Sequence, residues 1–312
     1  MASFSRIFYK LQSVYIGGVE VKGVQSVGTS STTNIESFAS FGTFNVQTLL
    51  QDMDLEITLE AALMSTENTL LGHLGYSGFD TSFFDTAQNV ELVYQTGANS
   101  DTFASIKLSA IISSYSAQMG TDGPVTESLT MVNSGSTAFT SGTEDSITGP
   151  TAAEMCTVVD RPDFTSFDRQ YREDCCSGDA ASSSPIPNVV SWSMSMDAST
   201  EKVSVLGQSL PFGKFATFPI ETSMEVEHHL SPAAASGGIG GFNSGTIESG
   251  SKLKDECYNP IVTVAGPKSW ALSGARRASI SRSGGDVGGG NVSISESFTG
   301  FNDLTHVNSG VS

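Results

Sequence analysis

The chain is poor in positive charge. It carries 15 Lys and Arg against 33 Asp and Glu among its 312 residues, so the formal net charge is −18 and the pI is about 4.4. Affinity for phosphates depends on Lys and Arg, so this balance disfavours a protein that binds free DNA. An acidic wall would instead repel nucleic acid, although simple solubility is an equally good reason for the charge.

Long apolar runs are also missing. No stretch approaches the roughly 20 apolar residues that a membrane-spanning helix needs. The segment Met1–Ser13 is polar and contains Arg6 and Lys10, without the apolar core of a signal peptide. We therefore expect no membrane association and synthesis in a cytosol.

Cysteine is scarce, and its spacing is uninformative. Cys156, Cys175, Cys176 and Cys257 include no C-x-x-C pair. In a cytosolic product we expect reduced thiols. A link from Cys156 or Cys176 to Cys257 is the alternative.

Catalytic signatures are absent too. The four histidines are scattered, and adjacent His228 and His229 on a strand would point to opposite faces. No G-x-S-x-G elbow occurs, and the glycine run Gly284–Gly290 lacks the G-K-[ST] ending of a phosphate loop, so a wide hairpin turn explains it better. Asp122 and Asp286 fit ordinary turn positions. We expect no enzyme activity, no metal and no cofactor.

What the sequence does contain points to β-structure. Only 15% of residues are charged, Gly, Ser and Thr are plentiful, and 38% are hydrophobic, which is enough for a packed core. The length suits two domains of roughly 150 residues. We predict an all-β chain of two tandem β-sandwich or partly closed β-barrel domains, each with a short flanking helix or loop.

The two domains are predicted from an internal repeat. The order of segments in 23–60 returns in 188–227: Ser26 corresponds to Ser191, 165 positions later, and Glu60 to Glu227, 167 positions later. Downstream, 111–132 and 275–294 both run through a Gly-x-Asp turn. A tandem duplication explains this order, and chance likeness between two β-rich halves is the alternative. The predicted divisions are 1–150, a connecting excursion over 151–187, and 188–312.

Several elements can be placed. Gly17-Gly18 predicts a two-residue hairpin turn within Phe8–Val21. Ser65–Leu74 is predicted to be a short helix capped by Ser65 or Thr66 and ended by Gly75. Further strands are predicted at Gly23–Ser30, Leu55–Leu63, Asn89–Tyr94, Ile106–Ile112, Tyr258–Val264, Trp270–Ser281 and Asn291–Phe298, and a hairpin is predicted at Tyr115–Val132. Ser134–Ala152 is predicted to be a connection, and Ser166–Asp174 a short helix.

Two predicted loops are unusually apolar. Phe38–Met53 and its counterpart Ser209–Pro219 lie between predicted strands, and exposed apolar loops tend to be interaction surfaces. Folding of each loop back onto its own core is the alternative. The residues expected to make contacts between subunits or rings are Phe41, Phe44, Leu49, Leu210, Phe212 and Phe215.

This pattern resembles phage tail tube proteins. The resemblance is carried by the strand at 23–27, Gly42 and the strand at 54–60, and in the second copy by 190–192, Leu206-Gly207 and 218–227. The closing hairpins at 120–123 and 283–286 fit as well. It covers most of 10–132 and 188–303 and leaves the segment 155–187 unexplained.

The resemblance implies a structural virion protein. Its subunits would form rings that stack head to tail into a hollow tube, with the long loops contacting the next ring and DNA passing through the lumen without specific binding. Two copies per chain imply a trimeric ring with pseudo-sixfold symmetry, or a hexamer if the second copy is an outer decoration. Further implied partners are the baseplate, the terminator, the tape measure and, in a contractile tail, a sheath. The protein would be located in the virion tail.

Two other functions stay open at this point. One is a different β-sandwich virion component, such as a baseplate, terminator or surface protein. The other is a secreted binding module or hydrolase.

Overall fold

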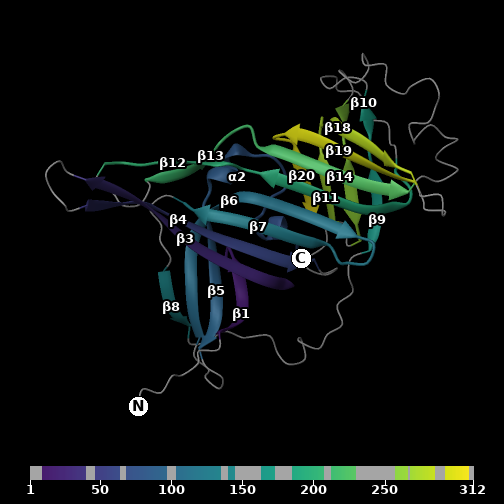
Figure 1. Ribbon diagram of the computed structural model, residues 1–312. Helices are drawn as coiled ribbons and strands as arrows, with labels where there is room; N and C mark the ends of the chain where they lie inside the picture. The colour runs from purple at the N-terminus through teal and green to yellow at the C-terminus, as the bar shows by residue number, and fades with distance from the viewer. Residues whose placement is uncertain are drawn as a thin grey trace.

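In the computed structural model, the described part of the chain folds mostly into antiparallel β-strands, with two short helices (Figure 1). The structure describes residues 9–39, 46–63, 68–96, 103–134, 140–144, 163–172, 185–206, 212–229, 257–265, 268–284 and 292–308. Large antiparallel sheets pack across shared apolar residues, so the predicted all-β sandwich is confirmed.

Four strands from the N-terminal half form the first part of the main sheet. They pair antiparallel in the order β3, β4, β7, β6. Their bounds are β3 (Val24–Ala39), β4 (Val46–Ala62), β7 (Thr126–Asn133) and β6 (Phe103–Gly120). We call this set unit 1.

The second part of the main sheet repeats this arrangement. Its strands pair in the order β11, β14, β19, β18, and β11 also pairs with β6 of unit 1. Their bounds are β11 (Val189–Asp197), β14 (Glu221–His229), β19 (Ser293–Phe301) and β18 (Arg276–Ser283). We call this set unit 2. Because every pairing is antiparallel, β3 and β11 run in the same direction, so the two units follow one another head to tail.

The strand registers match as well as the strand order. One row of opposed residues across unit 1 reads Ser26, Glu60, Ser128, Ser116, and one row across unit 2 reads Ser191, Glu227, Ser295, Ser281. The sequence offsets of 165 at Ser26 and 167 at Glu60 thus connect residues that occupy the same place in the two ladders.

A second layer covers the inner face of unit 2. It is a four-stranded sheet in the order β20, β17, β16, β9, which crosses the direction of the main strands in Figure 1. The bounds are β9 (Phe164–Asp168), β16 (Ile261–Val264), β17 (Lys268–Leu272) and β20 (Leu304–Asn308). Trp270 of β17 joins the layers: its ring lies 5.3 Å from that of Trp192, and its indole N–H donates to the Tyr115 hydroxyl at 3.1 Å.

A further branch of the main sheet extends from unit 1, because β6 is long enough to pair with two sets of strands. Residues 103–110 of β6 pair with β5 (Gln88–Thr96), which pairs in turn with β1 (Tyr9–Ile16), and β1 with β2 (Val19–Val21). The β1–β2 turn has φ of 60° at Gly17 and 83° at Gly18, as predicted for a Gly-Gly hairpin. β8 (Thr140–Glu144) pairs with the other edge of β6, within a segment expected to be only a connection.

The predicted helix exists but is shorter than expected. α1 (Leu70–His73) is capped by Thr69, whose hydroxyl accepts from the Gly72 N–H at 2.9 Å. The expected caps at 65 and 66 lie outside the described residues. Gly75 follows the helix with φ of 76°, as expected of a terminating glycine. A second helix, α2 (Thr81–Asp85), was not predicted, and it buries Phe84.

The prediction of a loop over Phe38–Met53 is wrong. β3 and β4 continue as one long hairpin, with Ile35 opposite Leu50 and Ala39 opposite Val46. Within this hairpin, only residues 40–45 lie outside the part of the chain that the structure describes. The sequence of 46–53 does not alternate, so it lacks the strand pattern, but ladder pairing that has begun at the base of a hairpin continues along it. In unit 2 the corresponding stretch is interrupted and forms a separate hairpin of β12 (Thr200–Val203) and β13 (Gly213–Ala216).

The prediction of a helix over Ser166–Asp174 is also wrong. This stretch forms β9 and β10 (Tyr171–Arg172), and β10 pairs with β15 (Cys257–Tyr258). Phe167 is fully buried opposite Val262, and this burial favours a strand over a marginal helix. The predicted strand Trp270–Ser281 is two strands, β17 and β18, separated by a turn at Gly274 with φ of 79°.

The expectation of reduced thiols is wrong for Cys257, which is disulfide-bonded. The other three cysteines of the chain lie outside the described residues. Arg172 is opposite Cys257 in the β10–β15 ladder.

Candidate assembly surfaces

The main sheet has one buried face and one face turned to solvent. Residues alternate between the two along each strand: Leu59 is fully buried while Glu60 is exposed, and Val226 is buried while Glu225 is exposed. We call the solvent side of units 1 and 2 the outer face of the sheet.

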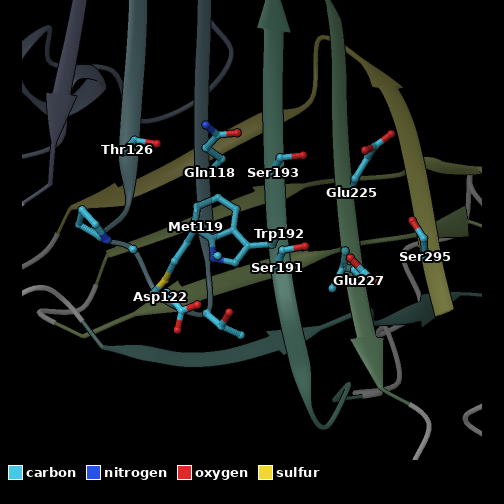
Figure 2. Close-up of a pocket in the computed structure, with 15 residues that line it drawn as sticks. Gln118, Met119, Asp122, Thr126, Ser191, Trp192, Ser193, Glu225, Glu227 and Ser295 are labelled. Atoms are coloured by element: carbon cyan, nitrogen blue, oxygen red, sulfur yellow. The ribbon is translucent and has the colours of Figure 1, made fainter. Parts of the chain in front are cut away.

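Polar side chains form continuous rows on this face. Figure 2 shows Thr126, Gln118, Ser193 and Glu225 side by side, although they come from four different strands. The rows cross the joint between the units at β6 and β11 without interruption. They line a shallow open hollow over β6, β11 and β14.

Hydroxyl groups dominate the rows and bond to one another across strands. Ser195 lies 2.8 Å from Ser223. On the far side of unit 2, Ser279 lies 2.8 Å from Ser297. Such pairs hold the hydroxyls in place and coat the face with groups that also bind water.

The charges on the outer face have one dominant sign. Its carboxylates are Asp54, Glu56, Glu60, Asp197, Glu221, Glu225 and Glu227. Among the described residues of these eight strands, the cations on the solvent side include Arg276, opposite Thr299, and Lys107 near the start of β6, which pairs with Glu91 of β5. A face of hydroxyls and carboxylates attracts water and repels phosphate.

Asp54 is a carboxylate of this set that is neutralised locally. Its carboxylate lies 2.9 Å from Lys214 Nζ and 3.4 Å from Lys202 Nζ. Burial raises the pKa of Asp54, but the two ammonium groups outweigh this and lower it overall. Both lysines belong to the β12–β13 hairpin, so the pairs attach that hairpin to the base of β4.

Two hairpin arms leave the same end of the main sheet, on the left in Figure 1. We define arm 1 as residues 33–39 and 46–53, and arm 2 as residues 200–206 and 212–216. They leave together because β3 and β11, which lead into them, run in the same direction. Each unit therefore contributes one arm.

Arm 2 is rich in exposed apolar side chains. Phe212 is 62% exposed, Phe215 is 45% exposed, and Leu206 is fully exposed. Val203 and Val205 are exposed beside them, and so is Ile35 on arm 1. Exposed large apolar groups gathered on one part of a surface are typical of an interface.

The other predicted contact residues are placed less completely. Leu49 lies in β4 opposite Glu36, within arm 1. Phe41, Phe44 and Leu210 lie outside the described residues. The alternative, that the loops fold back on the core, holds for Phe218, whose ring packs 5.9 Å from Phe79 and 6.5 Å from Phe84.

Both ends of the eight-strand ladder have an edge that no described strand covers. β3 pairs with β4 alone among the described strands, and from 279 to 283 β18 pairs with β19 alone. The residues along both edges, 28–32 and 281–283, are exposed.

Buried charges lie on the inner face, away from the rows. Glu127 of β7 accepts from the Tyr115 hydroxyl and the Leu70 N–H, and burial raises its pKa to about 7. Glu296 of β19 accepts two hydrogen bonds from Arg169, at 2.9 and 3.0 Å. Burial raises the pKa of Glu296, but His228 at 3.7 Å and the guanidinium groups lower it to about 2. The hydrogen bonds of these groups are made within the core.

In the part of the chain that the structure describes, no three His, Cys, Asp or Glu side chains come together to hold a metal ion. Nor is any helix there long and apolar enough to cross a membrane. No protein-family model matches the chain, and no curated protein sequence is significantly similar to it.

Sequence reasoning anticipated the apolar arms but not the outer face. The sequence pattern that indicates the face is a polar residue at every second position, for example Ser293, Ser295, Ser297 and Thr299 in β19. This pattern predicts a continuous face only when the strand pairing is known, because pairing places polar residues from distant parts of the chain side by side.

Proposed function

We propose that this chain is a structural subunit of a phage tail tube, in which rings of subunits stack into a hollow conduit for DNA. The observation that carries the proposal is the head-to-tail repetition of two units in one sheet, with an acidic, hydroxyl-rich face that continues across their joint. Repeating units that add edge to edge in one direction build a closed ring when the rotation per unit closes.

The outer face of the sheet suits the lumen of such a ring. DNA must move along the wall without binding to it. A wall with many carboxylates and hydroxyls has few cations that could bind the phosphates of DNA. Repulsion acts over about one Debye length, roughly 8 Å at physiological salt.

The arms suit the contacts between stacked rings. Arms 1 and 2 leave the same end of the sheet, so in a ring they would all project toward one neighbouring ring (Figure 1). Burial of Leu206, Phe212 and Phe215 in that neighbour would supply the hydrophobic part of the stacking energy. Arm-into-ring contacts are heterologous and propagate as a filament.

With two units per chain, we infer three chains per ring and pseudo-sixfold symmetry. The implied partners are further copies of the chain and the other proteins of the tail, and the implied location is the virion. A different β-sandwich virion component is the second candidate, favoured by the residues of the excursion at 163–172, which add β9 and β10 to the fold.

Negative-stain electron microscopy of the purified full chain tests the proposal. We expect rings or tubes with a central hole, and mass photometry of the rings should give three chains. Compact monomers at high protein concentration would contradict the proposal.

A further inference from the structure

We propose that β18 of one copy of the chain pairs antiparallel with β3 of the next copy, in a register fixed by the joint between β6 and β11. This inference rests on the proposed function for the closed ring and deepens it by naming the contact between chains. Its basis is the internal joint, which shows how one unit adds to another.

The internal joint provides the template. Ser114 is opposite Asp197, Ser116 opposite Ser195, and Gln118 opposite Ser193. The joint therefore consists of the last strand of unit 1 and the first strand of unit 2, paired antiparallel over residues 114–120 and 191–197.

The outer edges of the ladder are the equivalents of these two strands. β18 is the last strand of unit 2, as β6 is of unit 1, because Ser281 takes the place opposite Ser295 that Ser116 takes opposite Ser128. β3 is the first strand of unit 1, because Ser26 faces Glu60 as Ser191 faces Glu227.

Transfer of the internal register to these edges gives definite partners. Ser116 corresponds to Ser281, and Ser195 corresponds to Ser30, so Ser281 of one copy should lie opposite Ser30 of the next. By the same shift of 165 positions, Ser279 should lie opposite Thr32, and Ser283 opposite Gly28. The strands run in the directions that antiparallel pairing needs, since β18 and β6 are parallel to one another, as are β3 and β11.

The chemistry of both edges favours pairing with another chain. Exposed strand edges are usually protected by Lys, Pro, charge or short length. From 26 to 32, β3 is made only of Ser, Val, Gly and Thr, without a charge or a proline. From 279 to 283, β18 reads Ser-Ile-Ser-Arg-Ser, with one charge. By contrast β2, at another end of the sheet, has three residues, one of them Glu20.

The contact would also complete the outer face. The new pairs Ser281–Ser30 and Ser279–Thr32 place hydroxyls opposite hydroxyls, as Ser116–Ser195 does inside the chain. The rows of the outer face then continue from chain to chain, which matches the repetition within the chain.

Cysteine cross-linking tests the register. Residues directly opposite in an antiparallel pair have Cα atoms about 4.5 to 5.5 Å apart, within the reach of a disulfide. The double variant S30C/S281C should form intermolecular disulfides under mild oxidation, in a ladder on non-reducing gels that ends at the number of chains in a ring. The control S26C/S281C moves one cysteine four residues, roughly 13 Å, along β3 and should cross-link at least tenfold more slowly. The unmodified chain measures background from its own cysteines.

The outcomes separate this inference from the proposed function. Tubes without S30C/S281C cross-links, or with faster cross-linking of S26C/S281C, would overturn the register and leave the tube in place. Cross-linked oligomers that never form rings or tubes would support the pairing and contradict the tube. Hydrogen exchange on the unmodified chain gives a second measurement: amides of 28–32 and 279–283 should become protected on assembly, and unchanged exchange there would overturn the pairing.

Discussion

Ser26 and Glu60 lie directly opposite one another in the ladder between β3 and β4, and the Ser26 hydroxyl donates to Glu60 Oε2 at 2.7 Å. The same place in unit 2 holds Ser191 opposite Glu227. A serine opposite a glutamate is thus repeated on the outer face of both units. A tandem duplication would account for the shared register, and it would give the proposed lumen one surface chemistry throughout.

The first prediction concerns the charge of this face. The double variant E225K/E227K should fold and assemble as the natural chain does, because both side chains point to solvent from β14. Its assembled form should retain DNA, whereas the natural assembly should not, because the variant adds clustered cations to a wall that lacks them. Co-sedimentation of short duplex DNA at 50 and 200 mM salt measures this.

The matched control for the first prediction is E201K. Glu201 is exposed on arm 2, away from the rows of the outer face. Its substitution should leave DNA retention low. Equal retention by E201K and E225K/E227K would mean that net charge, and not the face, decides DNA contact.

The second prediction concerns arm 2. The variant F212D/F215D removes two exposed apolar rings and should leave the free energy of unfolding within about 0.5 kcal/mol, as is usual for exposed sites. Stacking should be lost, so that microscopy shows single rings in place of tubes. V307D, at a residue 50% exposed on β20 and outside the arms, is the control and should still stack. Tubes of undiminished length in F212D/F215D would contradict the assignment of the arms.

The sequence was most informative where the pattern was local. Alternation and the Gly17-Gly18 pair located β1, β2 and their turn, and the offsets between Ser26 and Ser191 and between Glu60 and Glu227 identified residues that share a ladder position. These signals depend on period-two placement and turn chemistry, which a single sequence displays directly.

The parts that could not be predicted depend on distant pairing. The strand register of 46–53 is imposed by β3, and β9 forms because Phe167 is buried opposite Val262, nearly a hundred positions away. The outer face needs the order of eight strands before its rows exist. A local reading of the sequence contains none of these pairings.

The third prediction concerns the buried ion pair between Arg169 and Glu296. R169A should destabilise the fold by roughly 3 to 5 kcal/mol, because it leaves a buried carboxylate with fewer partners. K107A removes the more exposed pair of Lys107 with Glu91, where the lysine side chain is 45% exposed, and should cost less than about 1 kcal/mol. Urea unfolding at pH 7 compares them. Equal losses would mean that Glu296 is stabilised by its other neighbours.

The fourth prediction concerns Glu127 and pH. Burial raises the pKa of this carboxyl from 4.5 to about 7 in the folded chain. Between these values the folded state holds a proton that the unfolded state has released, so stability falls as the pH rises from about 4.5 through about 7. E127Q keeps one acceptor oxygen, which can accept from the Leu70 N–H, and presents an amide NH2 toward the Tyr115 oxygen, but it cannot ionise.

The free energy of unfolding of the natural chain should therefore decrease by up to about 3 kcal/mol more than that of E127Q between pH 4.5 and 8. Urea unfolding at half-unit steps of pH measures the difference. E60Q, which changes an exposed carboxylate of the outer face, should follow the natural chain. Parallel curves for E127Q and the natural chain would show that Glu127 stays ionised in the fold. Its hydrogen bonds from Tyr115 and Leu70 and the nearby charge of Lys268 would then offset the cost of burial.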